Sequence, residues 1–107
     1  MYKVVAVWTA PAAEDREAFE KHYFDVHVPK AARVPHLQDL ILVRNEHSTA
    51  EDWYGSAEMT YVDEEAFKES LASSEWAEMA ADTQHMEKTF NVSLKVLLGK
   101  ENRWPVG

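Results

Sequence analysis

The order in which strand-like and helical segments follow one another constrains this chain most strongly. Short runs rich in valine and aromatic residues predict strands, and blocks of helix-forming residues separate them in the order strand, helix, strand, strand, helix, strand. This order is typical of the ferredoxin-like fold, an α+β (βαββαβ) architecture whose four-stranded antiparallel sheet carries helices on one face. The predicted strands are 2–8, 37–45, 53–62 and 92–98, and the predicted helices are 12–28, 64–72 and 75–88.

Two boundaries of these segments can be predicted from local chemistry. Pro29 has no N–H and restricts the backbone of Val28, so we expect the first helix to stop around Val28, with at most one further helical turn over 30–34. The polar stretch 46–52 separates the second and third predicted strands, which indicates a hairpin loop.

The predicted strands carry apolar residues on both faces of the sheet. In the third strand, alternation places Ala57, Met59 and Tyr61 toward the helices, and Tyr54 and Glu58 on the other face. An apolar face that no helix covers needs another partner to bury it. We therefore expect two copies of the chain to pair face to face as a homodimer, with an apolar ligand pocket between or beneath their sheets.

The composition excludes several classes of protein. The chain has 107 residues, no cysteine and a formal net charge of −8. An acidic surface repels phosphate backbones, so we expect no nucleic-acid partner. No apolar run is long enough to span a bilayer, so we also expect no membrane partner. The lack of cysteine and of a signal-peptide pattern predicts a cytoplasmic location. The length predicts one domain over 1–99 followed by a tail over 100–107.

One motif in the first helix resembles a known family. His22 and Tyr23 are followed four residues later by His27 and then, after one residue, by Pro29. This pattern resembles the EthD family of the dimeric α+β barrel superfamily, and the resemblance extends over about residues 1–99. Further matches follow in order: Val34-Pro35, Ala57-Glu58-Met59, Ser74-Glu75-Trp76 and Asp82.

The resemblance implies a homodimer of facing ferredoxin-like sheets, each with a small apolar pocket. For the reaction itself we expect no bound organic cofactor. The superfamily includes cofactor-free monooxygenases, muconolactone isomerases, polyketide cyclases and haem-handling proteins, so the fold leaves the chemistry open. Two positions depart from the family pattern. Lys30 stands where an apolar residue, often leucine, is usual, and His36 stands where glycine is common.

The first helix supplies three candidate catalytic residues. Tyr23 and His27 are four residues apart and share a helix face, and histidine titrates near neutral pH, so both are candidates for acid–base chemistry at the pocket. The alternative is a structural network before Pro29. His22 is a weaker candidate, because residues five apart point about 140° from each other on a 3.6-residue helix. For the same reason we expect no metal pair, and no metal-site motif is present.

Glu58 is the fourth candidate catalytic residue. Its position in the middle of the third strand points it away from the helices. A carboxylate in an apolar cavity has a raised pKa and can act as a general acid or base. The alternative is an ion pair with Arg44 or Lys95 on a neighbouring strand.

Four other residues are candidates for binding a substrate. Lys30 and His36 follow the two prolines near the expected opening of the pocket. We expect Lys30 to be a charged rim residue that attracts an anionic or carbonyl-bearing ligand, and the alternative is a desolvated, reactive amine. Trp8 and Tyr54 could line a site for a flat aromatic ligand, or belong to the core or the dimer interface.

The sequence therefore favours a small homodimeric protein that acts on a small hydrophobic or aromatic compound by acid–base chemistry. Monooxygenase, isomerase and cyclase reactions all fit this description, and whether the protein is an enzyme stays open. A non-catalytic module that binds a small ligand or haem is the second hypothesis. An interaction domain with a filled cavity is the third.

Overall fold

A computed structural model describes residues 1–47 and 52–107, and it confirms the predicted α+β ferredoxin-like fold. The strands form one antiparallel sheet in the order β2-β3-β1-β4. The middle of the expected loop at 46–52 lies outside the described residues. The elements are β1 (Tyr2–Thr9), η1 (Ala13–Asp15), α1 (Arg16–His22), η2 (Tyr23–His27), α2 (Val28–Ala31), β2 (Asp39–Arg44), β3 (Trp53–Tyr61), α3 (Glu64–Leu71), α4 (Ser74–Phe90) and β4 (Leu94–Lys100).

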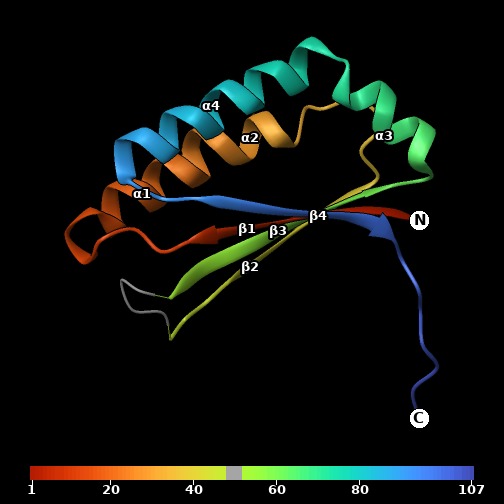
Figure 1. Cartoon of the computed structure of the whole chain (residues 1–107), viewed down its shortest axis with the longest axis horizontal. Coiled ribbons are helices and arrows are strands. Elements are labelled where there is room, and N and C mark those ends of the chain that lie inside the picture. Colours follow the sequence, from red (N-terminus) through yellow and green to blue (C-terminus); the bar gives the residue numbers. More distant parts are fainter. Residues whose placement is uncertain (48–51) are drawn as a thin grey trace.

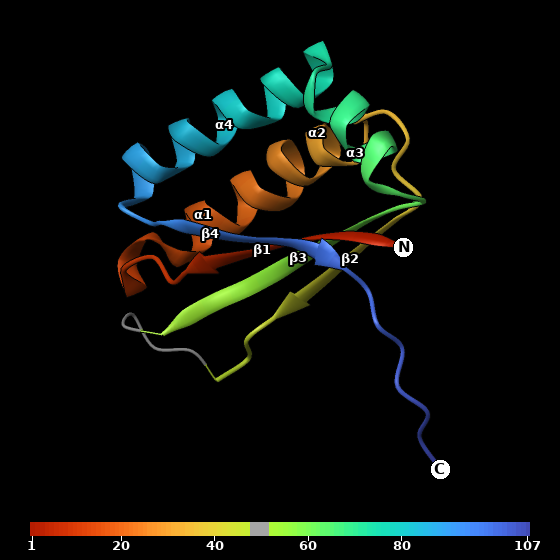
Figure 2. The ribbon, with the colours of Figure 1, turned by 45° about the vertical axis from the view of Figure 1, so that its right-hand side comes forward.

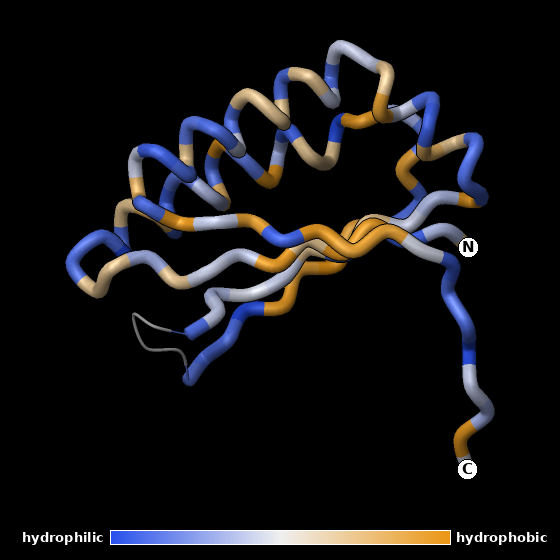
Figure 3. Tube along the Cα trace, in the orientation of Figure 1, coloured by the Kyte–Doolittle hydropathy of each residue, from blue (hydrophilic) through white to orange (hydrophobic). Residues whose placement is uncertain are grey.

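All the helices lie on one face of the sheet, and the other face is uncovered (Figure 1). Hydrophobic residues are concentrated in the middle of the sheet, whereas hydrophilic residues are frequent along the helices (Figure 3). After β4 the chain leaves the body on the side opposite the helices (Figure 2), and Trp104 in this tail is 84% exposed. No helix among the described residues is long and apolar enough to cross a membrane.

The alternation predicted for β3 is correct for most of the strand but wrong for Tyr54. Met59 and Tyr61 are buried under the helices as expected. Tyr54 is also buried on that side, against Phe19, because the pairing of β1 with β3 shifts by one residue next to Trp8. Such a β-bulge lets two successive residues oppose one partner, so strict alternation fails there.

Gly55 lies next to this bulge, opposite Trp8, and allows β2 and β3 to approach closely. A β-carbon at position 55 would lie 2.2 Å from the backbone oxygen of Val43. Any side chain at this position would therefore push the two strands apart.

The uncovered face, which we call the outer face, carries apolar side chains interspersed with polar ones. The apolar residues are Val5, Val7, Ile41, Val43 and Leu97, and the charged residues among them include Lys3, Glu58 and Lys95. Glu58 lies at its centre, opposite Val5 of β1 and Ile41 of β2, on the side predicted from the sequence. The exposed fractions of Ile41, Val43 and Leu97 on this face are 43%, 54% and 67%.

Candidate functional site

A cavity of about 200 Å³ lies between the sheet and the helices of a single chain. Its walls are almost entirely apolar, and only a few side chains with polar atoms reach it: Trp8, Tyr23, His27, Trp76 and Thr83. Of the two locations that the sequence left open, between facing sheets or beneath one sheet, the cavity occupies the second, on the helix side of the sheet.

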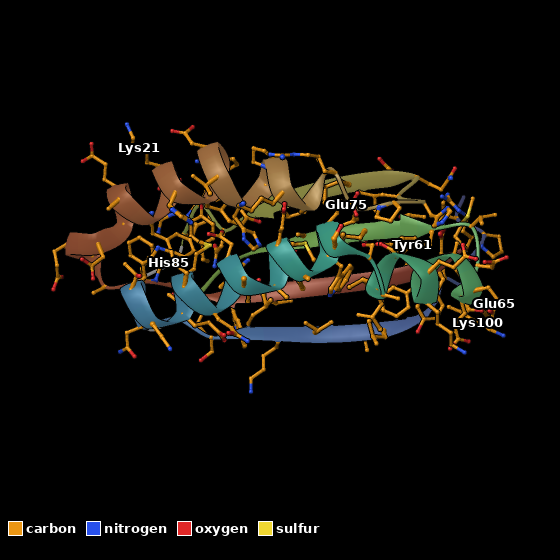
Figure 4. The ribbon with its side chains drawn as sticks, turned by 90° about the horizontal axis from the view of Figure 1, so that it is seen from above. Lys21, Tyr61, Glu65, Glu75, His85 and Lys100 are labelled. Carbon is orange, nitrogen blue, oxygen red and sulfur yellow. The ribbon has the colours of Figure 1, made fainter. Side chains whose placement is uncertain are left out.

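The cavity is open beside β4, where no helix covers the sheet. Figure 4 shows α4 lying along the middle of the sheet while β4 forms its edge. Leu71 of α3 and Val96 and Leu98 of β4 line the cavity and remain 48%, 53% and 48% exposed. The opening at this edge is therefore bordered by apolar side chains.

A π-helical turn shapes the wall of the cavity. In η2 the N–H of Val28 donates to the carbonyl oxygen of Tyr23, five residues back, instead of four. The prediction that the helix stops around Val28 is therefore wrong, because the chain continues as α2 through Pro29 to Ala31. The wider turn provides space for the proline ring, which would clash with the carbonyl group four residues earlier in a regular α-helix.

The same turn brings His22 and His27 onto one carboxylate. His27 Nδ1 lies 2.8 Å from Asp82 Oδ2, and His22 Nε2 lies 2.8 Å from Asp82 Oδ1. The expectation that these histidines point in different directions is thus wrong, because it assumed 3.6 residues per turn. π-bulges occur frequently at functional sites, and this one positions two titratable side chains.

Asp82 is a site residue that matched the EthD pattern but was not among the candidate catalytic or binding residues. It lies on α4 within a stripe of buried residues that also contains Met79, Met86 and Phe90. A carboxylate in an apolar helix stripe was the available signal, because buried charged groups are almost always paired.

Asp82 connects the cavity with the protein surface. His27 on one side is 7% exposed and lines the cavity. On the other side, the His22 side chain is 21% exposed, and its ring lies 5.3 Å from that of His85. His85, labelled in Figure 4, lies on the side of α4 that faces α1 and lines a shallow depression with Asp82 and Lys30.

Burial and hydrogen bonding determine the charge states of the site. Burial lowers the pKa of His27, although the hydrogen bond from its ring to Asp82 partly opposes this effect. Burial acts to raise the pKa of Asp82, but the hydrogen bonds from His27 and His22 outweigh it and lower the pKa. Burial raises the pKa of Tyr23 to about 12. At neutral pH the site therefore contains a neutral His27, an ionised Asp82 and a protonated Tyr23.

These charge states predict that the protein loses stability in mild acid. The unfolded chain binds the proton of His27 more tightly than the folded protein does, so stability falls as the pH drops below about 6.5. Asp82, whose pKa is lowered, adds a second loss at more acidic pH. We expect the urea midpoint to be lower at about pH 5 than at about pH 7.5, and His27→Gln to reduce this difference. An equal or higher midpoint at the acidic pH would contradict the lowered pKa of His27.

The structure brings Trp8, Tyr23 and His27 together at the cavity. The indole of Trp8 meets the His27 ring edge-on at 5.5 Å, and Tyr23 stacks on His27 at 6.0 Å. Tyr54 does not line the cavity, and its hydroxyl donates to Glu20 Oε2 at 3.2 Å.

The other candidate residues lie away from the cavity. Glu58 is on the outer face, where its carboxylate is 3.9 Å from the ammonium of Lys3 rather than beside Arg44 or Lys95. His36 is on the surface and pairs with Glu69 at 2.9 Å, in a left-handed conformation (φ 67°) that glycine adopts easily. Lys30 lies in the surface depression beside Asp82. Among the described residues, no group of three histidine or acidic side chains could hold a metal ion.

Comparisons with known proteins agree with this architecture. An ethyl tert-butyl ether d (EthD) family protein from Bacillus halodurans is 27% identical, with a TM-score of 0.79 over 95% of this chain and 99% of that one. HapK from Hahella chejuensis is 14% identical, with a TM-score of 0.71 over 100% of both chains. SnoaB, a cofactor-independent oxygenase from Streptomyces nogalater, is 17% identical, with a TM-score of 0.63 over 96% of this chain and 94% of that one.

The two structures of lower identity support the fold alone. None of the curated proteins matches the sequence.

The EthD domain matches residues 12–87, which include the π-helical turn and both histidines as well as Asp82. The match covers well over half of the chain and confirms the resemblance carried by His22, Tyr23, His27 and Pro29. The chain therefore belongs to the EthD family.

Proposed function

We propose that the protein is a small enzyme that holds a flat apolar molecule in its cavity and moves a proton on it, with His27 as the general base. The observation that carries this proposal is a buried, neutral histidine in the wall of an otherwise apolar cavity. A neutral imidazole can accept a proton at neutral pH, and perturbed titratable groups in apolar cavities are typical of acid–base catalysis.

The size of the cavity limits the substrate. Sites for drug-sized ligands occupy about 300–1,000 Å³, whereas an apolar cavity of about 150 Å³ holds benzene. The cavity of about 200 Å³ therefore suits one ring with substituents or two small fused rings. Haem is larger than these ligands, so the cavity supports a small organic compound better than haem.

The site provides a hydrogen-bond donor in addition to the base. With its pKa raised to about 12, Tyr23 keeps its proton throughout the physiological range. A phenol group can donate to an oxygen that gains negative charge when the base removes a proton. Trp8 and Tyr23 also present aromatic surfaces to a flat ring. The site thus contains the elements for proton abstraction next to a carbonyl group, a step that isomerisation, cyclisation and cofactor-independent oxygenation share.

A small unsaturated ketone tests this function directly. Cyclohex-3-en-1-one becomes its conjugated isomer when a base removes a proton next to the carbonyl and a proton returns two carbons further on. We expect the wild-type protein to accelerate this reaction over buffer, and His27→Gln to reduce the acceleration by about 10²-fold or more. The rise in ultraviolet absorbance of the conjugated ketone measures the rate.

Two controls separate catalysis from binding. His36→Gln makes the same chemical change in a histidine outside the cavity and should leave the rate unchanged. Cyclohexanone, which cannot isomerise, reports binding by NMR. Binding of cyclohexanone without isomerisation of the unsaturated ketone would favour the non-catalytic binding module over the enzyme.

We also propose that the outer face pairs with a second copy of the chain. Its apolar side chains include Val43 and Leu97, both more than half exposed in the single chain. Lys3 contacts Glu58 and Glu101, each at 3.9 Å, and Arg103 contacts Glu101 at 2.6 Å. These two positive and two negative charges balance within one chain, which reduces the cost of burying this part of the face.

A further inference from the structure

We propose that Asp82, held in place by His22, sets the tautomer of His27 so that the unprotonated Nε2 is the nitrogen available to the cavity. This inference rests on the proposed function of His27 as the base. It assigns Asp82 and His22 as positioning residues, which act on a substrate only through His27.

The hydrogen bonds around Asp82 determine where the ring proton of His27 lies. An ionised carboxylate only accepts hydrogen bonds, and Asp82 is ionised at neutral pH because its pKa is lowered. His27 Nδ1, at 2.8 Å from Asp82 Oδ2, must therefore carry the proton. Because a neutral imidazole has a single ring proton, Nε2 then has a free electron pair. The opposite tautomer would place an N–H on Nε2, which cannot abstract a proton.

His22 fixes the carboxylate from the other side. Its Nε2 lies 2.8 Å from Asp82 Oδ1 and 3.1 Å from Asp82 Oδ2. The N–H of His22 therefore points at both carboxylate oxygens, and it is the ring that contacts Oδ1, which His27 does not contact. Hydrogen bonds to charged groups are shorter and stronger than neutral ones. Asp82 is 9% exposed, so losing one donor would leave a buried charge with less compensation.

The charged groups around this arrangement come from all the helices that contact it. His22 lies on α1, Lys30 on α2, and Glu78 and His85 on α4, beside Asp82. His22 and Lys30 both act to lower the pKa of His27, whereas Asp82 acts to raise it. Among these groups, Asp82 is the one that hydrogen-bonds the His27 ring and so selects its tautomer.

Nitrogen NMR on the full chain labelled with ¹⁵N-histidine tests the inference, because the shifts of the two ring nitrogens report which one is protonated. In the wild-type protein at neutral pH, we expect His27 to carry its proton on Nδ1. In Asp82→Leu, which removes the acceptor, we expect this preference to be lost. We also expect isomerisation of cyclohex-3-en-1-one to fall about 10²-fold or more, while cyclohexanone still binds.

Two further variants make the test specific. Glu69→Leu removes the carboxylate of the other His–carboxylate pair, next to His36, and should leave the tautomer and the rate unchanged. His22→Gln retains an N–H donor for Asp82 and should keep the His27 tautomer.

The inference is overturned if wild-type His27 carries its proton on Nε2. It is also overturned if Asp82→Leu changes neither the tautomer nor the rate. Should the wild-type protein fail to isomerise the ketone, the proposed function fails, but the tautomer measurement, which needs neither a variant nor a substrate, still decides the inference.

Discussion

Phe19→Ala is expected to lower the free energy of unfolding by about 3–5 kcal/mol, a large part of the total for a domain of this size. The Phe19 side chain is fully buried, with 0% exposure. Its ring contacts Tyr54 at 4.8 Å, Phe90 at 5.4 Å and Tyr23 at 5.9 Å. Truncation would remove these contacts and leave a void that the surrounding aromatic rings cannot fill.

Phe24→Ala is the matched control for this substitution. Phe24 lies on the same helical segment but is 42% exposed, so its truncation should cost about 1 kcal/mol or less. Urea unfolding of both variants gives the comparison. A cost for Phe19→Ala similar to that for Phe24→Ala would contradict the position of Phe19 at the centre of this core. Because Tyr23 lines the cavity and stacks on Phe19, Phe19→Ala should also weaken cyclohexanone binding.

The fold could be predicted because its signals are local and repeat along the chain. Period-two alternation placed Met59 and Glu58 on opposite faces, and it did so without knowledge of the neighbouring strands. Asp63 caps α3 by accepting the N–H of Ala66 at 2.9 Å, a short-range interaction that the sequence also indicates. The exception, Tyr54, lies at a bulge, where a change in the pairing of two strands determines the direction of the side chain.

The site was harder to predict because it depends on a departure from regular geometry. His27 and Tyr23 could be selected from their spacing, since residues four apart share a face in most helical backbones. The convergence of His22 and His27 depends on the π-helical turn, which the standard helical repeat does not predict. Asp82 is 55 residues beyond His27, so only the packing of α4 against η2 shows that the two side chains meet.

The location of the cavity could not be predicted from alternation alone. Both faces of the sheet carry apolar residues, so the sequence pattern did not distinguish the face that forms the cavity from the face that could bind a second copy. The structure places the cavity on the helix side and leaves the other face uncovered. Val4 and Met59 face the helices and the cavity, whereas Val5 and Leu97 are on the outer face. Glu58, which alternation placed correctly, is therefore separated from His27 by the sheet itself.

Leu97→Asp is expected to convert the proposed homodimer into a monomer. In an interface with two-fold symmetry, one substitution introduces two carboxylates, and each would have to be buried against the apolar side chains of the outer face. Leu97 is 67% exposed in the single chain, so the substitution should leave the folded monomer intact. We expect the dissociation constant to rise by about 10³-fold or more, measured by light scattering and sedimentation over a range of concentrations.

Phe24→Asp introduces the same charge at an exposed apolar residue on the helical side, and it should leave the dimer unchanged. Three results are informative. A wild-type protein that is monomeric at micromolar concentration would contradict the pairing of outer faces. A dimer that survives Leu97→Asp but not Phe24→Asp would place the interface on the helices. Loss of the dimer in Leu97→Asp alone, with urea unfolding of the monomer unchanged, would show that the apolar outer face is buried by a second copy, because the substitution then acts on association and not on folding.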